Sequence, residues 1–97
     1  MVNKLSNAKI EAKIKVLNHG IKQSWVIKSD KLYKCFAFND FLKAFEFMTK
    51  VAVIAENANH HPDWSNIYNK VDIYLTTHEV QGISERDFDL AALIEEL

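Results

Sequence analysis

Residues 67–77, IYNKVDIYLTT, decide the fold, because polar and apolar side chains alternate along most of this stretch. In a β-strand Val71, Ile73 and Leu75 would point to one face, and the polar residues between them would point to the other. The pattern predicts one long strand with a single buried face. Residues 64–68 also suit a strand, and a turn after them would make two strands; the pattern alone leaves both readings open.

A β-hairpin is predicted earlier in the chain. Residues 25–27 and 32–38 are rich in aromatic and apolar residues that favour strands, and Ser29-Asp30-Lys31 between them suits a turn. Because no crossover helix separates the strands of this pair or those of residues 64–77, the sheet is expected to be antiparallel.

A long apolar helix is predicted from about Phe41 to Asn59, with an N-cap supplied by Asn39-Asp40. It is expected to end because His61 precedes Pro62, and the residue before a proline disfavours the α conformation. One continuous apolar stripe is predicted on it, made of Phe41, Ala44, Phe45, Met48, Val51, Ala52 and Ala55. Further apolar residues fall outside this stripe, namely Leu42, Phe47, Val53 and Ile54. A helix that is apolar around most of its circumference needs two partners, so we expect the sheet on one side and another subunit on the other.

Two shorter helices are predicted near the ends of the chain. The first covers residues 7–18, with Ser6 as its N-cap and Gly20 just beyond its last turn. The last opens at Ser84, and Asp87 stands three residues later, as in a capping box. Its apolar residues are Phe88, Ala91, Ala92 and Ile94. The order is then α-β-β-α-β-β-α, an α+β fold in which helices pack on one face of an antiparallel four-stranded sheet, and we expect residues 1–97 to form one domain.

Three of the four histidines lie beside carboxylates in two short runs. Imidazole and carboxylate exchange protons readily near neutral pH, so the two runs predict an acid–base site if they meet in one pocket. Glu56 and His60 stand four residues apart near a helix end, so they share a face and can hydrogen-bond. For this pair alone, an ordinary polar pair on an exposed face is the commoner case. The runs are Glu56-Asn57-Ala58-Asn59-His60-His61-Pro62 and Thr76-Thr77-His78-Glu79.

Residues near these runs are candidates for contact with a flat heterocyclic ligand. Trp64 offers a large rigid ring, although a tryptophan of the core or rim is the commoner case. Thr76 and Thr77 offer hydroxyl groups at a strand end, although β-propensity alone would explain them. Asp87 is expected to cap its own helix and is also a candidate to orient His78.

Other classes of function have less support. A metal site would use the same histidines, but adjacent histidines rarely converge on one ion and no His-x-x-x-His or cysteine pair is present, so we expect no metal. Two glycines leave no phosphate-binding loop, and no nucleophile elbow is present. A net charge of −1 and the absence of a recognisable module argue against direct nucleic-acid binding.

The composition predicts a soluble protein of the cytoplasm. Of the 97 residues, 48% are hydrophobic, but no apolar run approaches the roughly 18 residues that a membrane span needs, and no basic-then-apolar leader is present. The single cysteine, Cys35, excludes an internal disulfide and suits a reducing compartment. We therefore expect a cytoplasmic location, with the nucleus as a second one.

The acid–base residues stand at spacings that resemble those of the pterin-4a-carbinolamine dehydratases. The matching pattern is Glu56-x3-His60-His61-Pro62-x5-Tyr68-x9-His78-x8-Asp87. Other stretches are similar to the family as well, namely Phe41-x3-Phe45-x-Phe47-Met48, Asn69-Lys70-Val71, Thr77-His78-Glu79 and Gly82-Ile83-Ser84-Glu85-Arg86-Asp87. The resemblance covers about residues 25–95 and is weak before Trp25.

This resemblance implies a lyase that dehydrates 4a-hydroxytetrahydropterin to quinonoid dihydropterin, in tetrahydrobiopterin recycling for aromatic amino-acid hydroxylases. It implies neither a metal nor an organic cofactor. It also implies dimers or tetramers formed through the helix of residues 40–59. The catalytic residues that it implies are His60, His61 and His78, with Glu56 and Asp87 as supporting carboxylates. The substrate contacts that it implies lie in Asn59-His60-His61 and Thr76-Thr77-His78-Glu79. Some animal members bind a homeodomain transcription factor, so a non-enzymatic partner of a transcription factor is the alternative function.

Overall fold

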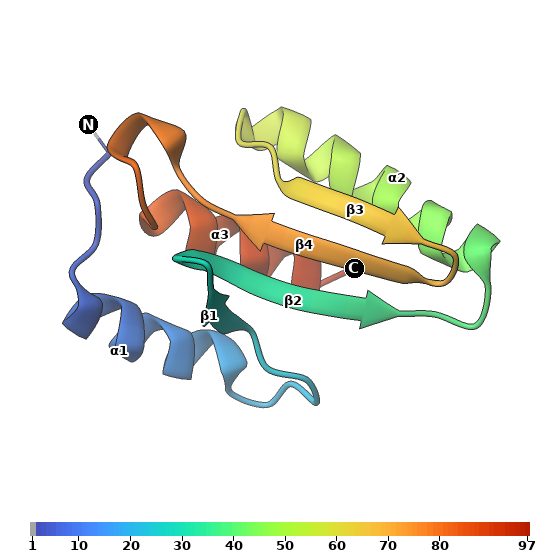
Figure 1. The fold of residues 1–97 in the computed structure, drawn as a ribbon, viewed down its shortest axis with the longest axis horizontal. Helices are drawn as coiled ribbons and strands as arrows, with labels where there is room; N and C mark the ends of the chain where they lie inside the picture. The colour runs from blue at the N-terminus through green and yellow to red at the C-terminus, as the bar shows by residue number, and fades with distance from the viewer. Residues whose placement is uncertain (1) are drawn as a thin grey trace.

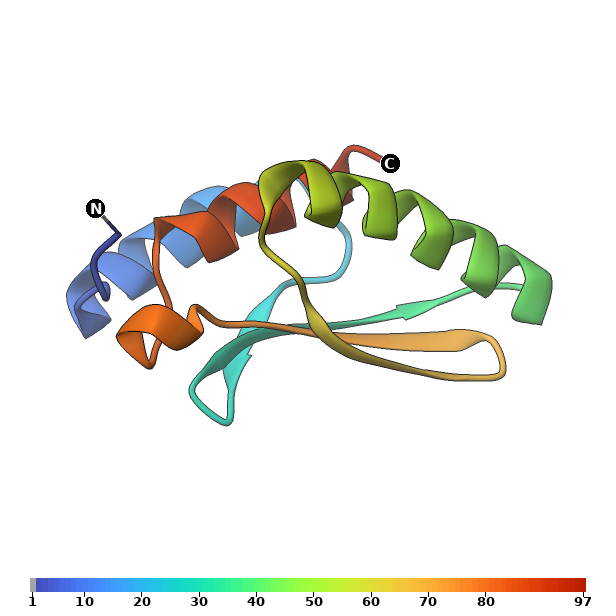
Figure 2. The same cartoon turned by 90° about the horizontal axis from the view of Figure 1, so that it is seen from above.

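Three helices cover one face of a four-stranded antiparallel sheet, which confirms the predicted α+β fold and its element order (Figure 1). The computed structural model describes residues 2–97. The elements are α1 (Asn7–Asn18), β1 (Val26–Lys28), β2 (Lys31–Ala37), α2 (Phe41–Ala58), β3 (Asp63–Ile67), β4 (Lys70–Leu75), the short 3₁₀ helix η1 (His78–Val80) and α3 (Glu85–Glu95). The strands lie in the order β1-β2-β4-β3. Seen from above, the three helices lie on the same side of the sheet (Figure 2).

Of the two readings of residues 64–77, the structure has two strands. β4 keeps the predicted alternation, with Val71, Ile73 and Leu75 fully buried. The chain reverses before β4, where Tyr68 adopts a left-handed conformation (φ 50°) and the Asn66 amide donates hydrogen bonds to two backbone oxygens of the turn. Because β3 and β4 pair antiparallel, the start of β3 lies beside the end of β4. This pairing later determines which residues meet at the candidate site.

The predicted hairpin is confirmed as β1 and β2. Val26 pairs with Tyr33, and the strands are joined through Ser29 and Asp30. Both turn residues have positive φ, 53° and 59°, as the tightest hairpin turns require. The hairpin sets the edge of the sheet opposite to β3.

α2 buries a different stripe from the one predicted. Ala44, Val51 and Ala55 are buried, and Phe47 packs on Phe36 of β2 with 4.7 Å between the ring centroids. Three residues of the predicted stripe are exposed instead, namely Phe41, Phe45 and Ala52, whereas Phe47 and Ile54, outside that stripe, pack against the core. The helix is apolar over a wider arc than the sheet can cover, so docking selects which part of the arc is buried.

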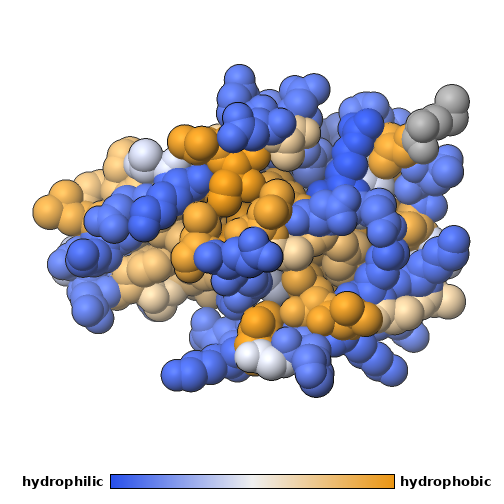
Figure 3. Space-filling model, turned by 180° about the vertical axis from the view of Figure 1, so that it is seen from behind, coloured by the Kyte–Doolittle hydropathy of each residue, from blue (hydrophilic) through white to orange (hydrophobic). Residues whose placement is uncertain are grey.

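The docking of α2 leaves a second apolar surface uncovered, which we call the outer α2 face and which comprises Phe41, Leu42, Phe45 and Val53. Leu42 is 75% exposed and Phe45 is 52% exposed. The space-filling view from the helical side shows apolar side chains gathered there between charged ones (Figure 3). Neither α2 nor any other helix within residues 2–97 has the length and apolar character of a membrane span.

The two terminal helices are capped as predicted. Ser6 Oγ accepts a hydrogen bond from the Lys9 amide, and Gly20 adopts the left-handed conformation (φ 79°) just past α1. Ser84 and Asp87 form a capping box at the start of α3. The buried residues of α3 are Asp87, Phe88, Leu90, Ala91 and Ile94, whereas Ala92, expected on the apolar side, is exposed.

Candidate active site

The end of α2 sets the directions of the two adjacent histidines. The helix ends at Ala58 because Asn59 adopts the left-handed conformation (φ 50°). The Asn59 amide donates to the Glu56 carbonyl (3.1 Å) and the His60 amide donates to the Ala55 carbonyl (3.0 Å), which together form a Schellman motif. The helix therefore ends through Asn59 itself, before the residue at which the proline was expected to stop it. After this turn His60 is only 8% exposed, whereas His61 is exposed.

Each of these histidines has its own carboxylate. His60 Nε2 lies 2.6 Å from Asp87 Oδ1, and His61 Nε2 lies 2.7 Å from Glu56 Oε1. The predicted pair between Glu56 and His60 is therefore wrong. The prediction assumed that His60 continues the helix, but the left-handed turn at Asn59 carries His60 inward and brings His61 over Glu56.

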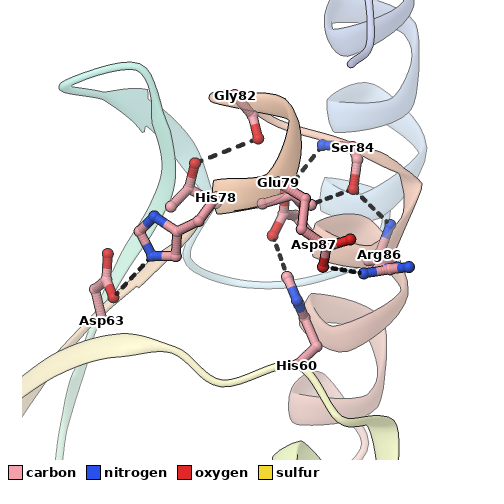
Figure 4. A network of polar contacts seen from close by, with 10 residues as sticks. His60, Asp63, His78, Glu79, Gly82, Ser84, Arg86 and Asp87 are labelled. Carbon is pink, nitrogen blue, oxygen red and sulfur yellow. Dashed lines mark hydrogen bonds and ion pairs between the residues drawn. The ribbon is translucent and has the colours of Figure 1, made fainter. Parts of the chain in front are cut away.

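Asp87 is fully buried and uses both of its oxygens. Oδ2 accepts hydrogen bonds from the Ser84 amide and from Thr77 Oγ1, both at 2.9 Å, and Oδ1 faces the His60 ring (Figure 4). The predicted capping role is thus present, but the histidine that Asp87 contacts is His60 and not the predicted His78. Asp87 joins α3, the end of β4 and the end of α2 at one point.

His78 lies at the start of η1, directly after β4 and Thr76-Thr77. Its Nε2 is 3.7 Å from Asp63 Oδ1, and Asp63 Oδ2 accepts a hydrogen bond from Lys31 Nζ at 3.1 Å. Sequence reasoning missed Asp63. The signal that would have found it is strand pairing, because Asp63 opens β3 opposite Tyr74, near the end of β4 where His78 follows.

The three histidines of the two runs, His60, His61 and His78, line one cleft of about 280 Å³. The cleft forms where the chain leaving α2 enters β3 and where β4 leads into η1. Its lining residues are Asn59, His60, His61, Pro62, Asp63, Thr76, Thr77, His78 and Glu79. A separate hollow of about 340 Å³ beside α1 is lined by no histidine. The cleft of the three imidazoles is therefore the candidate active site, since it gathers several groups that can give or take protons near neutral pH.

The family can be assigned at this point. The chain matches the family described as "Pterin 4 alpha carbinolamine dehydratase" over residues 3–97. The chain belongs to this dehydratase family. The match extends upstream of Trp25 and takes in α1, which the residue-level resemblance did not cover.

Individual relatives agree with this assignment. A protein of Sinorhizobium medicae strain WSM419, named "Putative pterin-4-alpha-carbinolamine dehydratase", is 49% identical over 76 residues, which cover 76% of this chain and 72% of that protein. A protein of Sinorhizobium fredii with the same name is 47% identical over 76 residues, with the same coverage of both chains. The crystal structure of a transcriptional coactivator/pterin dehydratase from Brucella melitensis superposes with a TM-score of 0.87 at 32% identity, covering 97% of each chain.

All but one of the predicted ligand contacts line the cleft of this dehydratase-family fold. Trp64 does not line the cleft, because it pairs with Ile73 and so faces the core side of the sheet, where it packs. Thr76 Oγ1 donates to the Gly82 carbonyl at 3.3 Å, and Glu79 accepts a hydrogen bond from Arg86 at 2.9 Å. Of the predicted substrate-contacting residues, only Trp64 lies outside the cleft lining.

The acid–base groups of the cleft do not form a metal-binding cluster. Among residues 2–97, no three His, Cys, Asp or Glu side chains are grouped so that they could hold a metal ion. His60 faces Asp87 inside the fold, His61 faces Glu56 at the surface, and His78 lies nearest Asp63. The imidazoles are thus distributed around a cleft, each with a different carboxylate.

Proposed function

We propose that this protein dehydrates 4a-hydroxytetrahydropterin to quinonoid dihydropterin and water by histidine acid–base catalysis. The observation that carries the proposal is the meeting of His60, His61 and His78 at one cleft in a chain of the dehydratase family. The names of the Sinorhizobium and Brucella relatives support the same reaction class. The reaction needs no oxidant or reductant, because it only removes water.

The elimination requires two proton transfers on one flat substrate. An acid must protonate the 4a-hydroxyl as the C–O bond breaks, and a base must take the ring N–H proton as the new C=N double bond forms. Each positioned group typically contributes about 10²–10⁴-fold to the rate. We assign the acid to His61 or His78, which are exposed at the cleft, and the base to the remaining histidines, with Glu56 as a relay.

We infer that the protein acts in the recycling of a reduced pterin cofactor. An aromatic amino-acid hydroxylase that releases 4a-hydroxytetrahydropterin would supply the substrate, and a reductase acting on quinonoid dihydropterin would consume the product. We propose that the protein catalyses this reaction in the cytoplasm.

Stopped-flow measurement of dehydration, with substrate generated by such a hydroxylase, tests the proposal. We expect the wild-type protein to accelerate dehydration and the single substitutions His60→Ala, His61→Ala and His78→Ala to lower kcat, with at least one loss of about 10²-fold. His19→Ala is the matched control, because His19 is exposed just past α1 and lies outside the cleft lining. Near-normal rates in all three cleft variants would reject the histidine assignment, and an inactive wild-type protein would reject the reaction.

A second function, binding of a transcription factor by a homo-oligomer, is favoured by one specific observation. The outer α2 face exposes Phe41, Leu42, Phe45 and Val53 in one chain, and large apolar patches of this kind mark interaction sites. The Brucella neighbour is named a transcriptional coactivator as well as a pterin dehydratase. We propose that α2 forms a homodimer or homotetramer through this face, and that a transcription factor would bind the same oligomer. The two functions are compatible because they use different surfaces.

A further inference from the structure

The hydrogen-bond partner of His60 indicates which ring nitrogen is available to accept a proton from a substrate. When Asp87 is ionised, its carboxylate can only accept hydrogen bonds, and the 2.6 Å contact with Asp87 Oδ1 then places the hydrogen on His60 Nε2. Among residues 2–97 this is the only hydrogen bond of the ring, and no buried side-chain nitrogen in that range lacks a partner. His60 Nδ1 is therefore accessible. Because His60 lines the cleft, we infer that Nδ1 is reached from the cleft.

A chain of hydroxyl groups behind Asp87 runs in a single direction. Thr77 Oγ1 donates to Asp87 Oδ2 at 2.9 Å, so the hydroxyl of Ser84, 2.6 Å from Thr77 Oγ1, must be the donor between those two. Ser84 Oγ in turn accepts the Arg86 amide at 3.2 Å as the N-cap of α3. Every hydrogen in this network is assigned, and the carboxylate is held by donors on both of its oxygens.

The single hydroxyl hydrogen of Thr77 is used within this network. Its side chain is in the core, with 1% of the residue exposed, and its hydroxyl both donates to Asp87 and accepts from Ser84. No second hydrogen remains for a ligand. The hydroxyl of Thr77 is thus aimed at Asp87 rather than at the cleft, although other parts of the residue line the cleft.

We propose that Thr77 is a positioning residue that acts through Asp87, and that His60 reacts through Nδ1. The inference rests on the proposed dehydration. In that step Nδ1 accepts the ring N–H proton of the substrate, the C=N double bond forms, the C–O bond breaks, and the hydroxyl leaves as water with a proton from His61 or His78. Asp87 keeps the hydrogen on Nε2 and stabilises the imidazolium that results, as a buried carboxylate does for a catalytic histidine. Thr77 and Ser84 prevent the carboxylate from turning away.

The ring nitrogen can be identified without any activity measurement. Long-range proton–nitrogen correlation spectra of the wild-type protein labelled with ¹⁵N-histidine report which nitrogen carries the hydrogen. We expect neutral His60 to be the Nε2–H form in the wild type and to become a mixture of forms in Thr77→Val. An Nδ1–H form in the wild type would overturn the proposal, and this result would not touch the proposed reaction.

Kinetics test whether Thr77 works through His60. We expect Thr77→Val to lower kcat about ten-fold and to keep KM within about two-fold of the wild-type value. The loss of kcat should be smaller than the roughly 10²–10⁴-fold contribution of a positioned acid–base group, because His60 itself remains. Thr77→Ser keeps the hydroxyl and should recover most of kcat. In a His60→Ala background, Thr77→Val should cause no further loss, because both changes remove the same function.

Other results overturn the proposal. A raised KM with unchanged kcat would make Thr77 a substrate contact, and an equal loss of kcat in the His60→Ala background would make its effect merely structural. Ser6→Ala is the matched control, because it removes a helix-capping hydroxyl from α1 that is not part of the cleft lining, and it should leave kcat unchanged. If the wild-type protein does not dehydrate the pterin, the proposed reaction fails while the nitrogen spectra still decide the geometry.

Discussion

At the residue scale, the candidate site gives each histidine a distinct surrounding. His60 is buried against a buried carboxylate, whereas the side chains of His61 and Glu56 are 58% and 80% exposed. A salt bridge between exposed groups contributes little to stability, so we expect the pair of His61 and Glu56 to affect the position of the imidazole ring more than the stability of the fold. The buried pair of His60 and Asp87 is expected to contribute both to the position of the His60 ring and to the stability of the fold, because Asp87 also caps α3.

Tyr33 gives a pH prediction at the same scale. Its hydroxyl donates to Asp72 Oδ1 at 2.5 Å, and this hydrogen bond, together with burial and the charge of Asp72, raises the pKa of Tyr33 well above its usual range. Above a pH of about 10 the unfolded chain loses the phenolic proton while the folded chain keeps it, so the free energy of unfolding should fall as the pH rises through this window.

Absorbance titration of tyrosinate and urea unfolding between about pH 8 and 11.5 measure this effect. Tyr33→Phe should show a weaker loss of stability above pH 10 and one fewer late-titrating tyrosine. Ionisation of the wild-type Tyr33 at the ordinary tyrosine pKa of about 10 would contradict the prediction. The charge of Asp72 also affects Cys35: burial and the nearby Asp72 raise the pKa of the Cys35 thiol. We therefore expect Cys35 to be alkylated slowly at neutral pH, because the thiolate is the reactive form.

At the element scale, the C-terminus of α2 determines where the histidines point. Asn59 holds φ at 50°, a conformation that costs most non-glycine residues about 1–2 kcal/mol, and asparagine is one of the residues that adopts it most readily. The left-handed turn separates the directions of His60 and His61, so a local backbone angle positions two imidazoles at once.

Substitution of Asn59 should therefore show a backbone effect. We expect Asn59→Ala to reduce the free energy of unfolding by about 1 kcal/mol relative to Asn59→Gly, measured by urea unfolding, because only glycine adopts this φ freely. Asn59→Gly should stay close to the wild-type stability. If both variants were equally stable, the left-handed turn would not be what ends the helix.

At the scale of the whole molecule, the cleft and the outer α2 face are separate surfaces of one chain. The cleft is lined by the segment between α2 and β3 and by the end of β4, whereas the outer face belongs to the first and middle turns of α2. Assembly through α2 therefore needs no cleft residue, and we expect catalysis and oligomerisation to be separable.

Light scattering coupled to size-exclusion chromatography tests this separation. We expect the wild-type protein to be a dimer or tetramer, and the double variant Leu42→Glu/Phe45→Glu to be a folded monomer, because two charges would be placed in the contact. The monomer should keep most of its dehydratase activity. Lys50→Glu is the control, since Lys50 is an exposed residue of α2 outside that face and pairs with Glu46. A monomeric wild-type protein, or a double variant of unchanged size, would contradict the proposed assembly.

The sequence alone determined the three helices, the hairpin and their order, and it left open whether residues 64–77 form one strand or two. Ser6, Asp40 and the Ser84–Asp87 capping box mark helix starts, and the alternation of residues 70–75 marks a strand with one buried face. These features depend on interactions between residues at most four positions apart, which the sequence displays directly. The spacing of the acid–base residues also identified the family, which the match over residues 3–97 bears out.

Only the tertiary structure decided which groups are partners. His60 and Asp87 are 27 residues apart, and the sequence favoured the neighbour Glu56 because it cannot show that the chain turns inward at Asn59. Asp63 and Trp64 were misjudged for a related reason: the register of β3 on β4 places the first at the cleft and the second toward the core. Pairings between distant residues follow from strand register and helix docking. These depend on the free energy of the whole folded chain, so a local sequence pattern does not reveal them.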